Sequence, residues 1–478
     1  MILASFINKI PLKTSLLITT LSSISLCKFI IVFIIIVSKV APLTSQQHHL
    51  LTNHKPSRVL LILTDGFAGH YLDWYENLDA FRRIRYEGVW SDQLIAEFPS
   101  LSLPNHYSLV TGMHPVHHGI VGNYMYDELT RRRFHCGTEP SDYDPHWWEQ
   151  AEPVKYDDHT SPVCIPYNGT SRSESLTLDN IKSLMAAFTS HTFILTYYNG
   201  IDLSGHRYGT FRLHRQLRGM KNPVIRFNAI LREILYVADI SKDLNVIVAS
   251  DHGMMNVPAE NKRYLDDYVD FSWIKQTVES GALTQIIPTP GHAKHIYNML
   301  TVINPIPNVK IYWTTPDRST IPSSFHYVKS PRVAELVLIA DPGYGIFIKS
   351  TNSYASNKQL PPATIYDWAA GMHGYDPRHR AMHGVFLAYG PDFHRAYHKP
   401  RLKLIDIHPL LCHILNLTCP FSDGNFNNIK DVLINHAGRS THILPLQALN
   451  MISQFHALIR LLGFACSCVV MRQVVMAM

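Results

Sequence analysis

Three short apolar segments, each leading into an aspartate, place the strongest constraint on the fold. They are VLLILT before Asp65, FILTYYNGI before Asp202 and NVIVAS before Asp251. Continuous apolarity over such a length is typical of strands buried on both faces, as in parallel sheets covered by helices. We therefore predict an α/β fold with a central, mostly parallel sheet sandwiched by helices, together with a smaller insertion region. Amphipathic patterns predict covering helices at residues 176–188 and 228–237.

The composition is that of a folded globular protein. The chain has 478 residues, of which 46% are hydrophobic and 17% are charged, and this balance excludes a disordered, collagen-like or coiled-coil protein. Lys and Arg number 43 against 37 Asp and Glu, which leaves a net charge of +6. This charge is too small and too evenly spread to predict binding to a nucleic-acid polymer.

Residues 1–41 are predicted to be either a cleaved signal peptide or an N-terminal membrane anchor. Their largely apolar stretch at residues 14–37 is interrupted by Lys28. Its length suffices for a bilayer span, but a central lysine costs about 3 kcal/mol of insertion, so both interpretations stay open. Residues 42–57 are then a linker, residues 58–436 the main domain, and residues 437–478 a tail. The apolar part of this tail is either a degraded membrane anchor or only an apolar segment.

Two further patterns predict a protein that is at the cell surface or secreted. Asn168 and Asn416 each begin an N-glycosylation sequon. Four cysteines lie in the part expected outside the cytosol, and oxidising conditions could pair them in three ways. They are Cys136, Cys164, Cys412 and Cys419.

Mixed carboxylate and imidazole pairs follow the predicted strands. Asp202 and His206 are four residues apart, and Asp251 and His252 are adjacent. Because the carboxyl ends of strands in an open α/β sheet frame the ligand crevice, these pairs are expected to converge with Asp65. Asp and His ligands together favour Zn²⁺, and adding His373 would supply three protein ligands for each of two zinc ions.

Ser102 is the candidate nucleophile. It lies in FPSLSLPNH, on a turn expected to open a helix that continues to Thr111. Metal coordination would activate its hydroxyl, and the helix N-terminus would favour a phosphoryl group. The alternative is a serine that only caps this helix. Three nearby histidines, His106, His117 and His118, are expected to be structural or solvent-facing.

Five stretches in order resemble the ectonucleotide pyrophosphatase/phosphodiesterase family of the alkaline phosphatase superfamily. They are LLILTDGF, FPSLSLPNHYSLVTGMHPVHHGIVGNYMYD, IDLSGHRYG, VIVASDHGM and HGYD followed by MHGVFLAYGPDF, and they span residues 58 to about 428. The resemblance implies an alkaline-phosphatase-like fold and makes residues 58–436 a phosphodiesterase catalytic domain. It also implies a hydrolase that cleaves phosphodiester or pyrophosphate bonds of nucleotides through a phosphoserine intermediate.

The same resemblance implies a role for each site residue. Asp202, His206 and His373 would hold one zinc, and Asp65, Asp251 and His252 the other. Ser102 would sit between the two ions as nucleophile and ligand. Asn123 and the backbone N–H of Leu103 would stabilise the transition state, and Tyr167 would stack on a nucleotide base.

The sequence also departs from the family pattern. Leu101 and Leu103 replace a lysine and an aromatic residue of nucleotide-cleaving members, and a segment that usually follows the position of Trp148 is missing. Two alternatives therefore remain. One is a phosphodiesterase acting on choline headgroups, such as those of lysophospholipids or glycerophosphocholine, and the other is a catalytically weakened surface protein that binds nucleotides.

Overall fold

The computed structural model describes residues 57–135, 140–151, 153, 192–214, 222–328, 330–349, 368–419 and 421–434. The expected signal or anchor, the linker up to residue 56, the expected helix at residues 176–188 and the tail lie outside these ranges. So do Tyr167, Asn168, Cys136 and Cys164. Within the described ranges, no helix has the length and apolarity needed to cross a bilayer.

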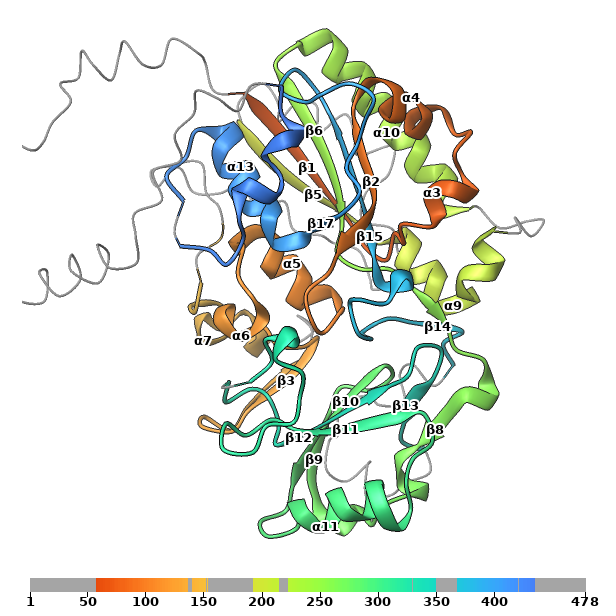
Figure 1. The fold of residues 1–478 in the computed structure, drawn as a ribbon, viewed down its shortest axis with the longest axis vertical. Coiled ribbons are helices and arrows are strands. Elements are labelled where there is room, and N and C mark those ends of the chain that lie inside the picture. The colour runs from red at the N-terminus through yellow and green to blue at the C-terminus, as the bar shows by residue number, and fades with distance from the viewer. Residues whose placement is uncertain are drawn as a thin grey trace, which may run out of the picture. The chain divides into compact units, whose positions relative to one another are not determined.

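A mostly parallel sheet forms the centre of the fold (Figure 1). Its strand order is β16-β2-β15-β6-β1-β5, and β17 also pairs with β2. Only β15 runs antiparallel to its neighbours. The strands are β1 (Arg58–Thr64), β2 (Val89–Ile95), β5 (Phe193–Tyr198), β6 (Leu244–Ser250), β15 (Gly384–Tyr389), β16 (Tyr397–His398) and β17 (Leu402–Lys403). The predicted fold class is thus confirmed.

The three apolar segments form β1, β5 and β6, but they differ in burial. β6 is buried throughout, and β1 is buried after its first residue. We also expected β5 to be buried on both faces. This expectation is wrong, because most of β5 is half-buried and Leu195 is 42% exposed. The reason is its place in the sheet, because β5 pairs with β1 on one side and is the last strand of the described order.

Helices cover both faces of the sheet. Alternate residues of a strand point to opposite faces, so Leu60 and Ile62 of β1 belong to one core cluster and Leu61 and Leu63 to another. The first cluster includes residues of α3 (Tyr71–Trp74), α4 (Asp79–Glu87) and α10 (Pro223–Ser241). The second includes residues of α5 (Ser102–Thr111) and α13 (Ile407–Leu415). This is the predicted sandwich of helices around the sheet.

Helix α10 shows how local sequence sets these boundaries. Asn222 caps its start by accepting hydrogen bonds from the N–H groups of Val224 and Ile225, and Pro223 occupies the first turn, where no donor is needed. Its buried apolar residues, among them Phe227, Leu231 and Ile234, belong to the core cluster that includes Leu60 and Ile62 of β1. The helix predicted at residues 228–237 is therefore confirmed and is longer at both ends than the apolar pattern alone indicated.

A second, smaller sheet lies between β6 and β15 in the sequence and corresponds to the predicted insertion region (Figure 1). Its four strands are antiparallel, in the order β11-β12-β10-β9. They are β9 (Ile274–Val278), β10 (Leu283–Pro288), β11 (Val309–Trp313) and β12 (Leu336–Ala340). The remaining helices are α6 (Pro115–His118), α7 (Pro145–Trp148), α9 (Gly200–His214) and α11 (Ala293–Asn298).

Three short strand pairs complete the described structure. β3 (Tyr124–Asp127) pairs antiparallel with β4 (Arg132–His135), and β14 (Gly371–Met372) pairs antiparallel with β7 (Met255–Asn256). The third pair is parallel and joins β13 (Gly345–Phe347) to β8 (Lys262–Tyr264). β3 directly follows Asn123, and β14 directly precedes His373.

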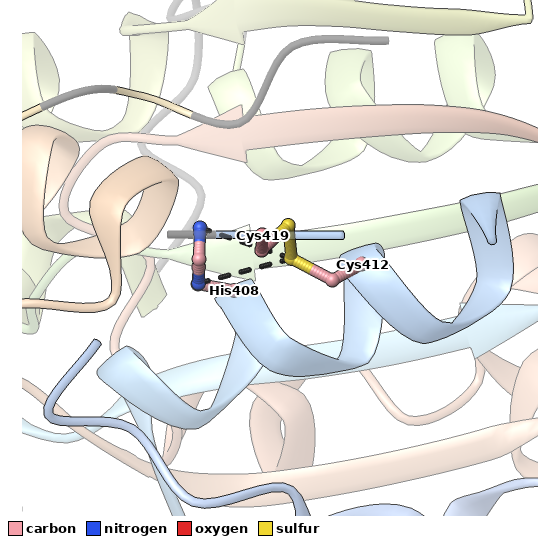
Figure 2. The surroundings of a disulfide bond; sticks show 3 residues. All are labelled: His408, Cys412 and Cys419. Atoms are coloured by element: carbon pink, nitrogen blue, oxygen red, sulfur yellow. Dashed lines mark hydrogen bonds between the residues drawn. A yellow bond between two sulfur atoms is a disulfide. The ribbon is translucent and has the colours of Figure 1, made fainter. Parts of the chain in front are cut away.

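A disulfide joins Cys412 of α13 to Cys419, which is one of the pairings that the sequence left open. His408 lies one turn earlier on the helix, with Nε2 3.8 Å from the Cys412 sulfur (Figure 2). Because both sulfurs are bonded to each other, these three residues do not form a thiolate metal site. Asn416, the second sequon asparagine, is exposed in the loop that the disulfide closes.

Replacing Phe227 by alanine is expected to lower the free energy of unfolding by about 3–5 kcal/mol. Phe227 is fully buried, and its ring centroid lies 5.1 Å from Tyr198 and 6.1 Å from Phe67, so truncation leaves a cavity between α10 and the sheet. Urea denaturation measures the change. Tyr236→Ala, on the same helix but with Tyr236 62% exposed, is the control and should change stability by about 0.5 kcal/mol or less. Equal losses would contradict this packing.

Candidate active site

Strand ends bring the candidate residues to one edge of the main sheet. Asp65 follows β1, and Asp251 follows β6, whose last residue Ser250 pairs with Thr64. The last residue of β5 also pairs with Thr64 and leads into α9, which carries Asp202. Parallel strands end at a common edge, so the three aspartates converge as the sequence predicts. All three side chains are buried.

Gly66 allows the loop after β1 to approach α9 closely. Its φ of +66° is left-handed, and a Cβ there would lie 3.0 Å from Cα, Cβ and Oδ1 of Asp202. A larger residue would therefore push Asp202 out of place. The glycine in LLILTDGF thus has a packing reason in addition to its backbone conformation.

Asp202, His206 and His373 form the first cluster. Asp202 and His206 are one turn apart on α9, and the Oδ2 of Asp202 lies 3.5 Å from the Nε2 of His206. His373 follows β14, and its Nε2 lies 3.6 Å from Oδ1 of Asp202 and 3.1 Å from Nε2 of His206. One donor atom from each residue therefore fits within 4.8 Å of the others.

Asp65, Asp251 and His252 form the second cluster, with the same limit of 4.8 Å between their donor atoms. The Nε2 of His252 lies 3.3 Å from Oδ1 of Asp65 and 3.5 Å from Oδ2 of Asp251. The His252 and His373 rings stack with centroids 3.6 Å apart, so the two clusters adjoin.

Ser102 is the first residue of α5 and faces the second cluster. Its Oγ lies 3.2 Å from Nε2 of His252 and 3.4 Å from Oδ1 of Asp65. The position before it, Leu101, is the N-cap, and no side chain caps the helix. The alternative in which Ser102 only caps the helix therefore does not describe its contacts.

Backbone carbonyls fix the orientation of all three clustered histidines. The Nδ1 atoms of His206, His252 and His373 lie 2.8, 2.8 and 3.0 Å from the carbonyl oxygens of Gly371, Gly253 and Ser100. A proton on Nδ1 that is donated to a carbonyl leaves the lone pair of Nε2 facing the cluster. This is the usual outer arrangement of metal-binding histidines.

The three buried carboxylates repel one another when no cation lies between them. Burial raises the pKa of Asp202 well above its ordinary value, and the charges of Asp65 and Asp251 raise it further. Burial also raises the pKa of Asp251, again with a contribution from Asp65. Burial acts against ionisation of Asp65 too, but hydrogen bonding and the charge of His252 outweigh it and keep the pKa of Asp65 below its usual range. A divalent cation would relieve this repulsion.

The residues fit zinc on three grounds. Each cluster combines carboxylate and imidazole donors, which suit Zn²⁺ better than Ca²⁺ or Mg²⁺. Each supplies three protein donors, as catalytic zinc sites do when a further position stays open. The Oδ1 of Asp202 is also buried and accepts no hydrogen bond from any described residue. Such an orphaned carboxylate oxygen has the expected environment of a metal ligand.

Asn123 lies beside α5. Its Oδ1 accepts the backbone N–H of Leu103 at 2.9 Å. The Asn123 amide and the Leu103 N–H, which the family resemblance implies to stabilise the transition state together, are therefore in contact. Leu103 itself packs against the apolar cluster that contains Phe98 and Tyr107.

Two residues that the sequence did not single out touch the second cluster. His106 was expected to be structural or solvent-facing, but its Nε2 lies 2.7 Å from Oδ2 of Asp251. Tyr197 donates its hydroxyl to Oδ2 of Asp65. His106 could have been found, because it lies one helical turn after Ser102 and therefore on the same face of α5. Tyr197 had no comparable spacing signal.

The other two histidines match their expectation in part. His117 is half exposed and pairs with Asp423, and His118 is buried with its Nε2 2.9 Å from the hydroxyl of Ser108. Neither contacts the two clusters through a hydrogen bond or ion pair among the described residues.

The chain belongs to the type I phosphodiesterase/nucleotide pyrophosphatase family, whose model matches residues 59–163 and 151–376. This confirms the resemblance to ectonucleotide pyrophosphatases/phosphodiesterases and makes the protein a hydrolase of that class. The two matched parts overlap at residues 151–163.

Among curated relatives, the chain is similar to bis(5'-adenosyl)-triphosphatase ENPP4 of Homo sapiens, at 30% identity over 80% of this chain and 83% of the relative. Ectonucleotide pyrophosphatase/phosphodiesterase family member 5 of Homo sapiens is also 30% identical, over 81% of this chain and 82% of the relative. The solved structure of human ENPP5 matches with a TM-score of 0.65 and 29% identity, covering 79% of this chain and all of that one. An inactive threonine-to-alanine variant of murine ENPP5 in complex with AMP matches with a TM-score of 0.66 and 27% identity, at the same coverage.

Asp202→Asn is expected to raise the free energy of unfolding of the zinc-free protein by about 1 kcal/mol or more. The substitution removes a buried carboxyl whose ionisation is opposed by burial and by two other carboxylates. Denaturation in the presence of a chelator measures the change. Asp431→Asn, which removes a surface partner of Lys399, is the control and should be neutral or lose up to about 1 kcal/mol. A zinc-free Asp202→Asn protein less stable than wild type would show that the three carboxylates do not repel as described.

Proposed function

We propose that the protein is a zinc-dependent hydrolase, acting outside the cytosol, that cleaves phosphodiester or pyrophosphate bonds of nucleotides through a phosphoserine intermediate. The observation that carries this proposal is the contact of the Ser102 hydroxyl with Asp65 and His252, in the second of two adjoining Asp/His clusters. Asp202, His206 and His373 would hold one zinc, Asp65, Asp251 and His252 the other, and Ser102 would contribute its oxygen. Two zinc ions would lower the pKa of the Ser102 hydroxyl and offset charge on the phosphoryl oxygens.

The protein's own residues supply the attack and the alignment. Ser102, after its proton has passed to solvent, forms the bond from Oγ to phosphorus while the bond from phosphorus to the leaving oxygen breaks. Its place in the first turn of α5 puts the phosphoryl group at a helix N-terminus, where N–H groups favour an anion. Water then attacks the phosphorus, the bond to Oγ breaks, and the serine hydroxyl returns.

Asn123 and the N–H of Leu103 would stabilise the charge that develops on the non-bridging oxygen. Their present contact of 2.9 Å keeps both groups at the start of α5. When substrate binds, the Leu103 N–H would leave the Asn123 Oδ1 and donate to the phosphoryl oxygen. In this role the Asn123 amide would turn its N–H group to the phosphoryl oxygen.

Similarity to relatives supports nucleotides as the substrate class. One relative is named as a bis(5'-adenosyl)-triphosphatase, and the ENPP5 variant structure contains AMP. Leu103 offers no ring for base stacking, which leaves Tyr167 as the proposed stacking residue. This apolar position also keeps choline-headgroup diesters as the competing substrate class.

The disulfide between Cys412 and Cys419 supports a location outside the cytosol, at the cell surface or secreted, because such bonds persist in oxidising compartments. The exposed position of Asn416 suits its proposed glycosylation. Residues 1–41 would then be either a membrane anchor or a signal peptide that is cleaved.

Ser102→Ala is expected to lower the turnover of a phosphodiester by about 10³-fold or more while two zinc ions per chain are retained. The six other ligands hold the metals, so loss of the hydroxyl removes the nucleophile rather than the site. Turnover and metal analysis of the purified protein measure the two effects separately.

Ser102→Thr is the matched control. It keeps a hydroxyl at the same position and should remain active. Equal rates for wild type and Ser102→Ala would remove Ser102 from the mechanism. A wild-type zinc content under one ion per chain would contradict the metal clusters.

Substrate choice is expected to favour diadenosine triphosphate over glycerophosphocholine by about tenfold or more in kcat/KM, since one base-stacking contact contributes about 1–3 kcal/mol. Parallel assays with both compounds measure the ratio. A ratio in favour of glycerophosphocholine would support the headgroup alternative, and binding of AMP without turnover of either compound would support the weakened nucleotide-binding protein.

A further inference from the structure

A buried carboxyl group outside the two clusters contacts the segment that carries Asn123. Glu279 directly follows β9 of the smaller sheet and is only 6% exposed. Its Oε1 accepts the backbone N–H of Tyr124 at 2.6 Å, and its carboxyl also accepts the backbone N–H of Asn123. One side chain therefore holds two successive amides of the Asn123 segment.

The backbone on both sides is shaped for this contact. Glu279 has a φ of +63°, a left-handed conformation that residues with a side chain rarely adopt. On the facing segment, a Cβ at Gly122 would lie 2.7 Å from the carbonyl oxygen of Tyr124 and 2.8 Å from Oε1 of Glu279, so both the turn and the approach of Glu279 depend on glycine. Unusual backbone conformations of this kind often occur at functional sites, where a side chain must be held in one place.

A second contact holds the same segment from the connection between β11 and β12 of this sheet. The hydroxyl of Tyr327 donates to the carbonyl oxygen of Val121 at 2.6 Å, and Nε2 of Gln285, in β10, lies 3.3 Å from that hydroxyl. Residues 121–124 are thus held from the smaller sheet, while the Asn123 side chain meets the Leu103 N–H next to Ser102.

We propose that Glu279 is a positioning residue for Asn123, whose carboxyl fixes the backbone of residues 123 and 124 so that the Asn123 amide meets the phosphoryl oxygen at Ser102. This inference rests on the proposed function. It assigns the smaller sheet a part in the reaction, because the group that aligns Asn123 comes from that sheet and not from the main one.

The environment of Glu279 agrees with this role. Burial raises the pKa of Glu279 to about 8, while its hydrogen bonds from the Tyr124 and Asn123 amides act in the opposite direction. The titratable side chain facing it is the phenol of Tyr327. A protonated carboxyl at neutral pH holds the two amides without adding a negative charge beside an anionic substrate. Glutamine has the same shape and also carries an accepting oxygen.

The decisive test is a set of variants assayed with a phosphodiester, with kcat and KM determined separately. Glu279→Ala should lower kcat about 10- to 100-fold and change KM by less than about threefold, as expected for a contact that acts in the transition state. Glu279→Gln should restore most of kcat. Gly122→Ala, which disturbs the same contact from the facing segment, should lower kcat in the same way.

A double substitution separates positioning from general damage. If Glu279 acts through Asn123, then Glu279→Ala should cost little further activity once Asn123→Ala is present. Thr284→Val is the matched control, because Thr284 is buried in β10 and its hydroxyl has no hydrogen-bond partner among the described residues. This control should leave kcat unchanged. Zinc content should be the same in all variants.

Hydrogen exchange of residues 120–126 gives a readout that does not depend on turnover. These amides should exchange faster in Glu279→Ala than in wild type and Thr284→Val. Fully additive losses in the double variant, a wild-type kcat in Glu279→Ala, or unchanged exchange would each overturn the inference. A wild type that lacks diester turnover would instead defeat the proposed function, and exchange alone would then show whether Glu279 holds the segment.

Discussion

The convergence of three buried carboxylates at the edge of the main sheet is the constraint on which the rest of the site depends. Asp65 and Asp251 directly follow neighbouring strands, and Asp202 lies in the first turn of the helix after β5, so the common end of these strands brings the three together. Removing like charges from water is unfavourable unless a cation or hydrogen bonds compensate. The surrounding imidazoles, with Nδ1 held by backbone carbonyls and Nε2 facing inward, do not offset this charge, but they complete two donor sets in which a divalent cation would do so.

Three structural layers contribute to the same reaction centre. The main sheet supplies the carboxylates, α5 supplies Ser102 and the Leu103 N–H, and the smaller sheet contacts the Asn123 segment through Glu279 and Tyr327. Ser102 has two close contacts in the second cluster, and the stacked His252 and His373 rings connect that cluster to the first. The candidate site is therefore built from residues on or directly beside helices and strands.

Similarity to ENPP4 and ENPP5 relatives at about 30% identity fits a conserved arrangement with altered surroundings. The six clustered residues, Ser102 and Asn123 keep the family pattern, while Leu101 and Leu103 change the apolar surface beside the nucleophile. In the proposed function, these two leucines would affect which group is bound next to the phosphorus. They leave intact the ends of the strands, where the carboxylates are set.

The sequence by itself determined β1, β5 and β6, the helices at Ser102 and at residues 228–237, and the convergence of the aspartates, because apolar runs and residue spacing encode local structure. Only the tertiary structure decided the rest. The partial exposure of β5 follows from its place in the strand order, and the contacts of His106 and Tyr197 with the second cluster follow from how α5 and β5 pack. Glu279 reaches Asn123 across 156 positions of sequence, and no local pattern can report a contact between segments so far apart.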